Sequence, residues 1–275
     1  ANATGGGFRN DGGAITNISS SNAAVFKSTI SNNQAINDQS GDGGGFYNTS
    51  AHSEVNLTDV VIENNTAGED GGGFKTAANY SEVNLTNVLV TMNSSADAGG
   101  GISVDSNGSE LYMTDTTVSF NEAGNNGGGM FTRGVVVGTN VVVDNNDAGS
   151  TDAADRRGGG IYNDAGVLHL TDATITNNVT AQRGGGIFNA SGGLVEIDSS
   201  DPDTFRSIIS GNSLTRSGSG NGAGFFQWSS SSRTILTDVD IRDNINTTND
   251  GGGFYVESDM SHVELYNVII DGNEA

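Results

Sequence analysis

Acidic side chains gather just before glycines at several points of the chain, and this arrangement is the first that suggests a ligand. The carboxylates are those of Asp42, Glu69, Asp70, Asp97 and Asp250. Because Ca²⁺ prefers several carboxylate and carbonyl oxygens together, these five residues are weak candidates for calcium ligands. Their spacing is not that of the nonapeptide calcium roll, and Arg157 and Arg183 occupy the same position in other repeats. The sequence therefore assigns no metal ligand and no cofactor, and calcium is the one cation to consider.

Charged residues in one segment offer the best constellation for cleaving polysaccharides. They are Asp152, Asp155, Arg156 and Arg157, with Arg183 one repeat later. Glycoside hydrolysis needs two carboxylates at a defined separation, and a lyase needs a base together with charge stabilisation. A surface loop of mixed charge meets neither requirement by itself, and the chain has no cysteine nucleophile. We therefore predict no catalytic residue, with a carbohydrate-active enzyme (a polysaccharide lyase or hydrolase) as the alternative.

Asn-x-Ser/Thr triplets are a third chemical feature, because such asparagines can accept N-linked glycans. The strand pattern described below predicts that Asn56 and Asn84 point outward and stack one repeat apart. Asn48, Asn79 and Asn107 are expected on nearby turns. These five asparagines are the predicted acceptors, provided that the host has the glycosylation machinery.

The elements that position these residues are set by an internal repeat. Three small residues and one apolar residue recur at Gly5–Phe8, Gly43–Phe46, Gly71–Phe74, Gly99–Ile102, Gly127–Met130, Gly158–Ile161, Gly184–Ile187, Gly222–Phe225 and Gly251–Phe254. Self-similarity at such a period predicts a solenoid, in which each repeat stacks on the next.

Each repeat alternates apolar and polar residues in the manner of a half-buried strand. In the repeat that begins at Gly71, Val83 and Leu85 alternate with polar residues, and Val88 and Val90 do so again after a break at Asn87. Three short strands cannot bury a face alone, but stacked repeats can. We predict an all-β fold: one right-handed parallel β-helix over residues 1–275, with about nine coils and three strands per coil.

Two polar columns support this prediction. One asparagine stands three places after an apolar residue in every repeat, at Asn33, Asn65, Asn93, Asn121, Asn146, Asn178, Asn212, Asn244 and Asn273. Asparagine tolerates the left-handed backbone of a corner, so its amides are expected to form a structural ladder along the axis. A second column marks the break between the two later strands, at Asp59, Asn87, Asp115, Asn140, Asp172, Asp238 and Asn267.

Insertions interrupt the period in three repeats. They cover residues 12–25, 149–157, and 198–204 together with 216–221. In a solenoid such insertions form loops, and loops are where binding sites usually lie.

The charge of the chain narrows the choice of partners. Asp and Glu number 33 against 11 Lys and Arg, which leaves a formal charge of −22. Such a surface repels nucleic acids and anionic membranes. No apolar run is long enough for a membrane span. The first residue is Ala1 rather than methionine, which fits either a removed export signal or a piece of a longer chain.

The repeat resembles that of the chlamydial polymorphic outer membrane proteins and of related right-handed β-helix surface proteins. Gly43-Gly44-Gly45-Phe46 stands where that family has its GG-small-apolar motif, and Ile62-Glu63-Asn64-Asn65 where it has its apolar-x-x-Asn motif. The resemblance covers the whole chain, although a third glycine and Ile or Val replace the residues that the family prefers. It implies a secreted or cell-surface protein with an adhesive or scaffolding role, and it brings no catalytic residues.

The two ends of the sequence are in register with each other. Gly251 stands seven positions after Asn244, and joining Ala275 to Ala1 also places Gly5 seven positions after Asn273. This predicts either further repeats of the same chain or subunits that stack head to tail into a filament. We therefore expect a non-catalytic structural or adhesive rod, with itself, a carbohydrate or a host-surface ligand as partner.

Overall fold

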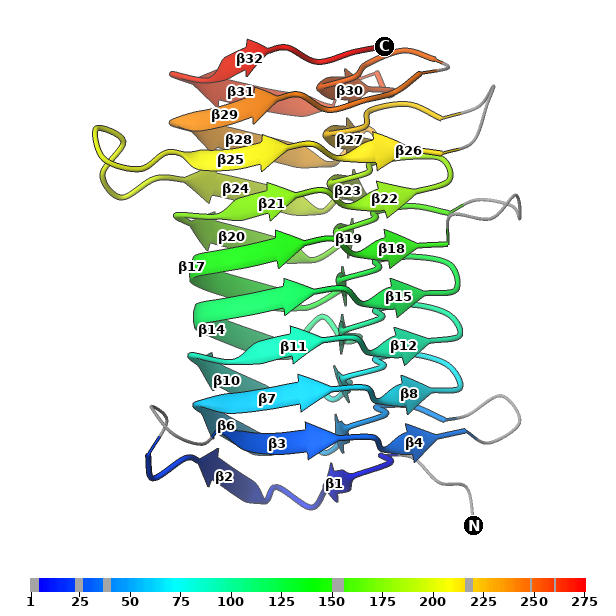
Figure 1. Ribbon diagram of the computed structural model, residues 1–275, viewed down its shortest axis with the longest axis vertical. Helices are drawn as coiled ribbons and strands as arrows, with labels where there is room; N and C mark the ends of the chain where they lie inside the picture. The colour runs from blue at the N-terminus through cyan, green and yellow to red at the C-terminus, as the bar shows by residue number, and fades with distance from the viewer. Residues whose placement is uncertain are drawn as a thin grey trace.

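The computed structural model of the protein describes residues 5–22, 27–36, 41–149, 156–215, 220–247, 249–259 and 261–275. Within these ranges every regular element is a β-strand, and the strands pair in parallel in three sheets. The coils wind right-handed and stack along one axis, with the N-terminal coil at one end and the C-terminal coil at the other (Figure 1). The predicted all-β right-handed parallel β-helix is therefore confirmed.

The first sheet follows the glycine motifs and has one strand per repeat. Its nine strands are, in spatial order, β1 (Phe8–Asn10), β5 (Phe46–Asn48), β9 (Phe74–Thr76), β13 (Ile102–Val104), β16 (Met130–Thr132), β19 (Ile161–Asp164), β23 (Ile187–Ala190), β27 (Phe225–Gln227) and β30 (Phe254–Val256).

The second sheet is bent and contains 16 strands. One half comprises β2 (Ile15–Ser19), β6 (Glu54–Thr58), β10 (Glu82–Thr86), β14 (Glu110–Ser119), β17 (Val135–Asp144), β20 (Val167–Thr171), β24 (Leu194–Asp198), β28 (Arg233–Thr237) and β31 (His262–Tyr266). The other half comprises β3 (Ser28–Ser31), β7 (Val60–Glu63), β11 (Leu89–Thr91), β21 (Thr174–Thr176), β25 (Ser207–Ser210), β29 (Val239–Arg242) and β32 (Ile269–Asp271). β14 and β17 are long enough to run through both halves.

The third sheet is made of two-residue strands. They are β4 (Gln34–Ala35), β8 (Thr66–Ala67), β12 (Ser94–Ser95), β15 (Glu122–Ala123), β18 (Asp147–Ala148), β22 (Val179–Thr180) and β26 (Ser213–Leu214). The sequence pattern describes the segment Met92–Ser95 as a turn, whereas Ser94 and Ser95 form β12. Strands this short have no visible alternation, so they leave no periodic signal.

Inward side chains stack in register and form one continuous core. Phe46 pairs with Phe8 on one side and Phe74 on the other, and the ring centroids of Phe46 and Phe74 lie 4.6 Å apart. The apolar residue of every glycine motif belongs to this column. Burial of such apolar surface is the main favourable contribution to folding.

The break residues of the second column make the bend of the second sheet. All seven have positive φ, for example 57° at Asp59 and 52° at Asn87. A single left-handed residue turns the chain sharply, and Asp and Asn adopt this backbone at low cost. Outside the bend their side chains form a second ladder, in which the Asn87 amide donates to Asp59 at 2.5 Å and the Asn140 amide donates to Asp115 at 2.6 Å.

The core ladder runs through the predicted asparagines. The Asn65 amide nitrogen donates to the amide oxygen of Asn93 at 2.9 Å and to the backbone oxygen of Ile30 at 2.9 Å. The same Asn93 oxygen also accepts the backbone N–H of Asn65 at 3.0 Å. Equivalent bonds join all nine ladder asparagines, from Asn33 to Asn273. Each buried amide is therefore satisfied by the adjoining coils.

The sequence predicts the left-handed corner at the ladder asparagine. The structure places it at the residue before. Asn64, Met92 and Phe120 have φ near +54°, while the asparagines that follow them do not have positive φ. The reason is that the corner residue turns its own side chain outward, whereas the next side chain points into the core. Met92 and Phe120 are accordingly exposed.

The three glycines of the motif have different roles, and in one repeat Ala223 takes the second position. Gly71 has a φ of +68°. A Cβ on Gly72 would lie 2.2 Å from the backbone oxygen of Gly100 in the next coil, and one on Gly73 would lie 3.2 Å from the Asn93 amide nitrogen. The motif therefore permits close stacking of coils and leaves room for the ladder.

The first predicted insertion is partly wrong. Residues 15–19 form β2, which pairs with β6 as an ordinary strand of the second sheet. The pattern hides it because the alternation is irregular: Ile15 is exposed in the register of Glu54, and Thr16 takes the inward position of Val55. Residues 150–155 and 216–219 of the other insertions lie outside the described ranges. Residues 199–206 form a loop that projects from the stack between β24 and β25 (Figure 1).

Replacement of a ladder asparagine is expected to be costly. In Asn93→Ala, the donors and acceptors of the adjoining coils lose their partners inside the core, so the free energy of unfolding should fall by at least about 3 kcal/mol. Asn84→Ala is the matched control, because Asn84 lies outward on the neighbouring strand; its effect should stay within about 1 kcal/mol. Denaturant titration compares the two, and similar losses would contradict the role of the ladder.

Candidate functional site

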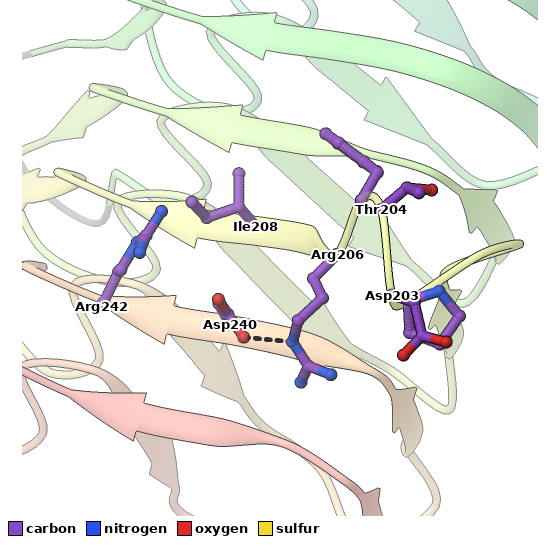
Figure 2. A pocket seen from close by; sticks show the side chains of 8 residues that line it. Asp203, Thr204, Arg206, Ile208, Asp240 and Arg242 are labelled. Atoms are coloured by element: carbon purple, nitrogen blue, oxygen red, sulfur yellow. Dashed lines mark hydrogen bonds and ion pairs between the residues drawn. The ribbon is translucent and has the colours of Figure 1, made fainter.

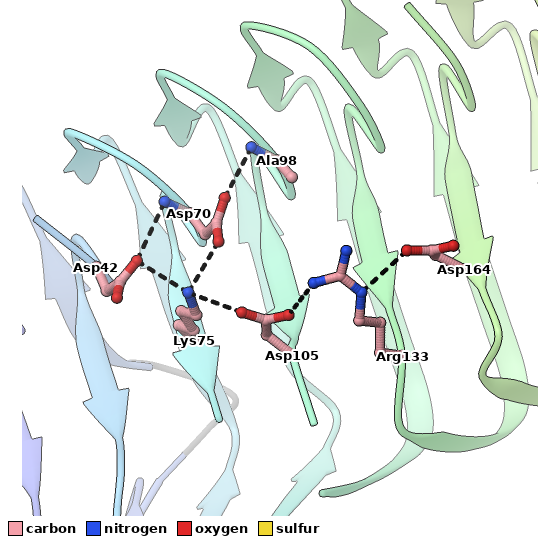
Figure 3. A network of polar contacts seen from close by, with 7 residues as sticks. All are labelled: Asp42, Asp70, Lys75, Ala98, Asp105, Arg133 and Asp164. Atoms are coloured by element: carbon pink, nitrogen blue, oxygen red, sulfur yellow. Dashed lines mark hydrogen bonds and ion pairs between the residues drawn. The ribbon is translucent and has the colours of Figure 1, made fainter. Parts of the chain in front are cut away.

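A row of alternating charges crosses the outer face of the first sheet (Figure 3). At its centre the Lys75 ammonium lies 2.8 Å from Asp70, 3.0 Å from Asp42 and 3.1 Å from Asp105. The Lys75 side chain is only 7% exposed, although it points away from the core. Register places Asp42, Lys75 and Asp105 on successive coils, so the row fastens one coil to the next.

Arg133 extends this row by two further coils. Its guanidinium donates to Asp105 at 2.8 Å and to Asp164 at 2.9 Å (Figure 3). Asp105 is therefore shared between Lys75 and Arg133. Side chains that are fixed by ion pairs on both sides are held rigidly, which favours a structural role for the row.

The pKa values in this row follow from burial and charge together. Burial by itself lowers the pKa of Lys75, but the carboxylates of Asp70, Asp42 and Asp105 outweigh it and raise that pKa above its ordinary value. Burial raises the pKa of Asp70, and the Lys75 ammonium opposes this rise. Lys75 is therefore held in its charged form throughout the neutral range.

Two of the predicted calcium ligands belong to this row. Asp42 and Asp70 both contact the Lys75 ammonium, while Asp97 accepts a hydrogen bond from the Asn125 amide at 2.7 Å. Among the described residues, no group of three or more His, Cys, Asp and Glu side chains has an arrangement that could hold a metal ion. Calcium binding at Asp42, Glu69, Asp70, Asp97 or Asp250 stays a prediction.

An outward column of aromatic residues lies on the same sheet, further along the axis. Its members are Phe131, Tyr162, Phe188, Phe226 and Tyr255, and the ring centroids of neighbours lie 5.0 to 5.5 Å apart. Sequence reasoning missed this column, although an aromatic residue directly after the inward apolar residue in five successive repeats was a visible signal.

Arginines cover most of this column. Arg157 lies 5.4 Å from the ring centroid of Phe188 and 5.2 Å from that of Trp228, and Arg183 lies 5.6 Å from that of Phe226. These distances are typical of cation–π contacts. The rings of Phe188 and Phe226 are fully buried, whereas Trp228 is 38% exposed. The aromatic column is thus covered by arginine side chains and does not offer an open aromatic surface to a ligand.

The predicted constellation in residues 152–157 is only partly described. Asp152 and Asp155 lie outside the described residues. Arg156 donates to the backbone oxygen of Gly124, and Arg157 packs on the aromatic column. Arg183 also packs on that column, and its Nε lies 3.9 Å from Glu257. The described arginines are therefore engaged with the solenoid.

A pocket opens between the loop 199–206 and the outer face of β25 and β29 (Figure 2). We call it the loop pocket; it has a volume of about 350 Å³ and is lined by Pro202, Asp203, Thr204, Phe205, Arg206, Ile208, Asp240 and Arg242. Arg206 donates to Asp240 at 2.6 Å and lies 3.4 Å from Asp238. Arg242 is exposed, and in the part of the chain that the structure describes its guanidinium forms no ion pair.

The predicted glycan acceptors differ in accessibility. The expected placement of Asn48 on a turn is wrong: it ends β5, is fully buried, and donates to the backbone oxygen of Glu82 at 3.2 Å. Asn79 and Asn107 are exposed on turns. Asn56 and Asn84 point outward and stack, with the Asn84 amide donating to Asn56 at 2.9 Å. Glycosylation of the four accessible asparagines stays a prediction.

Comparison with protein-family models, with curated proteins and with solved structures found no match to this chain. The likeness to the chlamydial surface proteins is therefore based on the repeat motifs alone. The described residues include no helix that is long and apolar enough to cross a membrane.

Removal of the central cation should make stability depend on pH in the acidic range. In Lys75→Met, Asp42 and Asp70 lose their cation and Asp105 keeps only Arg133, so the free energy of unfolding should fall by about 3 kcal/mol at pH 7. Their repulsion raises the pKa values of these carboxyls in the folded variant. Because a raised folded-state pKa favours folding at low pH, the deficit against wild type should shrink as the pH falls from 7 towards 4.

The wild type should behave differently. Since the folded-state pKa of Lys75 is raised, its ammonium stays charged from pH 4 to 10 and deprotonation reduces its contribution only above the ordinary value of about 10.4, so the change of the deficit in the acidic range comes from the carboxyls. Arg233→Met is the control, because the pair of Arg233 with Glu264 is solvent-exposed and contributes little. Denaturant titrations from pH 4 to 10 test this; a deficit that stays constant with pH would contradict the account.

Proposed function

We propose that the protein is a non-catalytic structural and adhesive β-solenoid that acts outside the cell or on its surface. The observation that carries this proposal is that the repeated polar side chains bind one another along the axis. The amides of the core ladder and the row from Asp42 to Asp164 join successive coils. Polar residues that recur in every coil are thereby used to hold a rod together.

The extracellular location rests on three features. The chain has a formal charge of −22, which suits a soluble exposed surface. Asn79 and Asn107 are exposed acceptor triplets, as in a secreted glycoprotein. The repeat motifs resemble those of chlamydial surface proteins, which implies a secreted or cell-surface adhesin.

The outermost described coils suggest how such a rod extends. Ile270, on the last coil, is 51% exposed although its counterparts in other coils are buried. At the opposite end Phe8, Ile18 and Ile30 line an open depression. One more coil of this repeat would cover either apolar surface, supplied by further repeats or by a second copy of the chain stacked head to tail.

Head-to-tail stacking predicts that particle length grows with concentration. Sedimentation and electron microscopy at rising protein concentration should detect rods longer than one chain, because each added copy buries two apolar ends. A species that stays at 28.0 kDa at every concentration would contradict stacking between copies and leave further repeats as the source of the next coil.

A carbohydrate-active enzyme is the second candidate function. It is favoured by the exposed Trp228 beside Arg157, with Glu257 nearby along the same outer face. Aromatic rings and charged groups of this kind also bind sugars without cleaving them, so binding and turnover must be measured separately.

Adhesion and catalysis make opposite predictions for one experiment. A panel of acidic and neutral polysaccharides is incubated with the protein, with and without calcium, and both retention and the release of reducing or unsaturated ends are measured. The proposed function predicts binding of at least one polysaccharide of the panel and no cleavage of any. Cleavage in either condition would overturn it, and a calcium requirement for binding would support the predicted calcium ligands.

A further inference from the structure

The loop pocket is the place in the described chain where a cavity and a free cation coincide. Its outer wall is the loop 199–206, which leaves the regular stack after β24 and returns at β25 (Figure 2). On the opposite wall Asp240 and Arg242 stand two residues apart on β29 and so share the outward face of the second sheet.

The loop is braced at the end where it leaves β24 and by hydrogen bonds within it. Ser200 donates its backbone N–H to Asp172 at 2.8 Å, and the Ser199 hydroxyl donates to the backbone oxygen of Asp238 at 2.8 Å. Within the loop, the N–H groups of Thr204 and Phe205 both donate to the backbone oxygen of Asp201. The wall is thus held in place before a ligand arrives, which lowers the entropic cost of binding.

The two arginines of the pocket have different tasks. Arg206 is neutralised by Asp240 and Asp238 and also donates to the backbone oxygens of Val239 and Asn267, so it builds the floor. Arg242 forms no ion pair within the described chain. Asp271 is its register partner on β32 but lies beyond ion-pair distance. A free guanidinium on a chain of charge −22 is a marked exception.

The surroundings of Arg242 restrict the anion that it can bind. A guanidinium fork matches a carboxylate with two parallel hydrogen bonds. Asp203 and Asp240 line the same pocket and would repel a second negative charge, which disfavours a phosphate dianion. They are instead hydrogen-bond acceptors, which suits a ligand rich in hydroxyl groups.

The apolar residues of the loop pocket also suit a sugar ring. Phe205 is 41% exposed, and Ile208 lies between the loop and Arg242 (Figure 2). Together they offer the C–H face of a sugar ring an apolar contact on each side. A volume of about 350 Å³ is at the small end of ligand pockets, which corresponds to one or two sugar residues.

We propose that the loop pocket binds an acidic sugar residue of the uronate class, with Arg242 on its carboxylate and Asp203 and Asp240 on its hydroxyls. This inference deepens the proposed adhesive function, on which it rests. It places recognition in an insertion of the solenoid, while the regular coils supply the support.

Calorimetric titration with oligoglucuronate tests the proposal, with the oligomer of glucose as neutral probe. Arg242→Gln should weaken oligoglucuronate binding about tenfold or more, because a charge-assisted pair is lost. Arg242→Lys should give an intermediate loss, since it keeps the charge but not the fork. Arg233→Gln removes the same charge from another exposed position, and binding should stay within about twofold of wild type.

Three results would contradict the proposal that the loop pocket binds a uronate. They are equal weakening by Arg242→Gln and Arg233→Gln, equal binding of the neutral oligomer, and no binding of oligoglucuronate by the wild type. Thermal unfolding of each variant checks the fold, and Arg242 is exposed, so no shift is expected. If an acidic polysaccharide binds but Arg242→Gln leaves its affinity unchanged, the proposed uronate site is wrong and the proposed adhesive function is retained. If no polysaccharide binds but free oligoglucuronate does, the proposed adhesive function is wrong and the proposed uronate site is retained.

Discussion

The hydrogen bonds of the core asparagine ladder are the constraint on which the rest of the structure depends. At every corner the chain brings a backbone N–H and a backbone oxygen into the interior, where each would cost free energy without a partner. One asparagine side chain satisfies both groups of the preceding coil: the Asn93 amide oxygen accepts the backbone N–H of Asn65, and its amide nitrogen donates to the backbone oxygen of Ile62 as well as to the next ladder amide. The third glycine of each motif lies against this amide, so the glycine motif and the asparagine form one structural unit. The amide-to-amide bonds of the ladder all run from one coil to the coil that follows it, and the ladder therefore has a direction along the axis.

Sequence reasoning recovered the features that repeat. The period, the inward column from Phe8 to Phe254, the bend at Asp59 and its counterparts, and the members of the core ladder all follow from residue type and spacing. It failed where position within the coil depends on backbone geometry. The left-handed residue is Asn64 rather than Asn65, and Asn48 faces inward, because both depend on where the coil turns. Contacts between coils, such as Lys75 with Asp42 and Asp105, depend on side-chain reach. The loop pocket has no periodic signal, since it arises from a segment that occurs once.

Regular coils and irregular segments have different roles in this molecule: the coils form the scaffold, and the irregular segments provide the proposed recognition site. In the coils, polar groups that face a neighbouring coil find their partner there, as Asn93 does in the ladder and Lys75 in the charged row. Even the outward aromatic column is covered by Arg157 and Arg183. Among the described residues, an exposed guanidinium without an ion pair lies where the period is broken, at Arg242 beside the loop 199–206. A recognition site on such a scaffold is therefore sought at departures from the repeat, whereas conspicuous repeated residues describe its architecture.

The outer ladder at the bend limits how the number of coils can change. Its residues alternate as Asp59, Asn87, Asp115, Asn140 and Asp172, so that each carboxylate faces an amide across the coil spacing of about 4.8 Å. Loss of a repeat that carries asparagine, or duplication of one that carries aspartate, would set two aspartates side by side, and like charges that are directly opposite repel. Gain or loss of two successive repeats would keep the alternation intact. The bend thus opposes those single-coil changes that bring two aspartates together, whereas changes by pairs of coils avoid this repulsion.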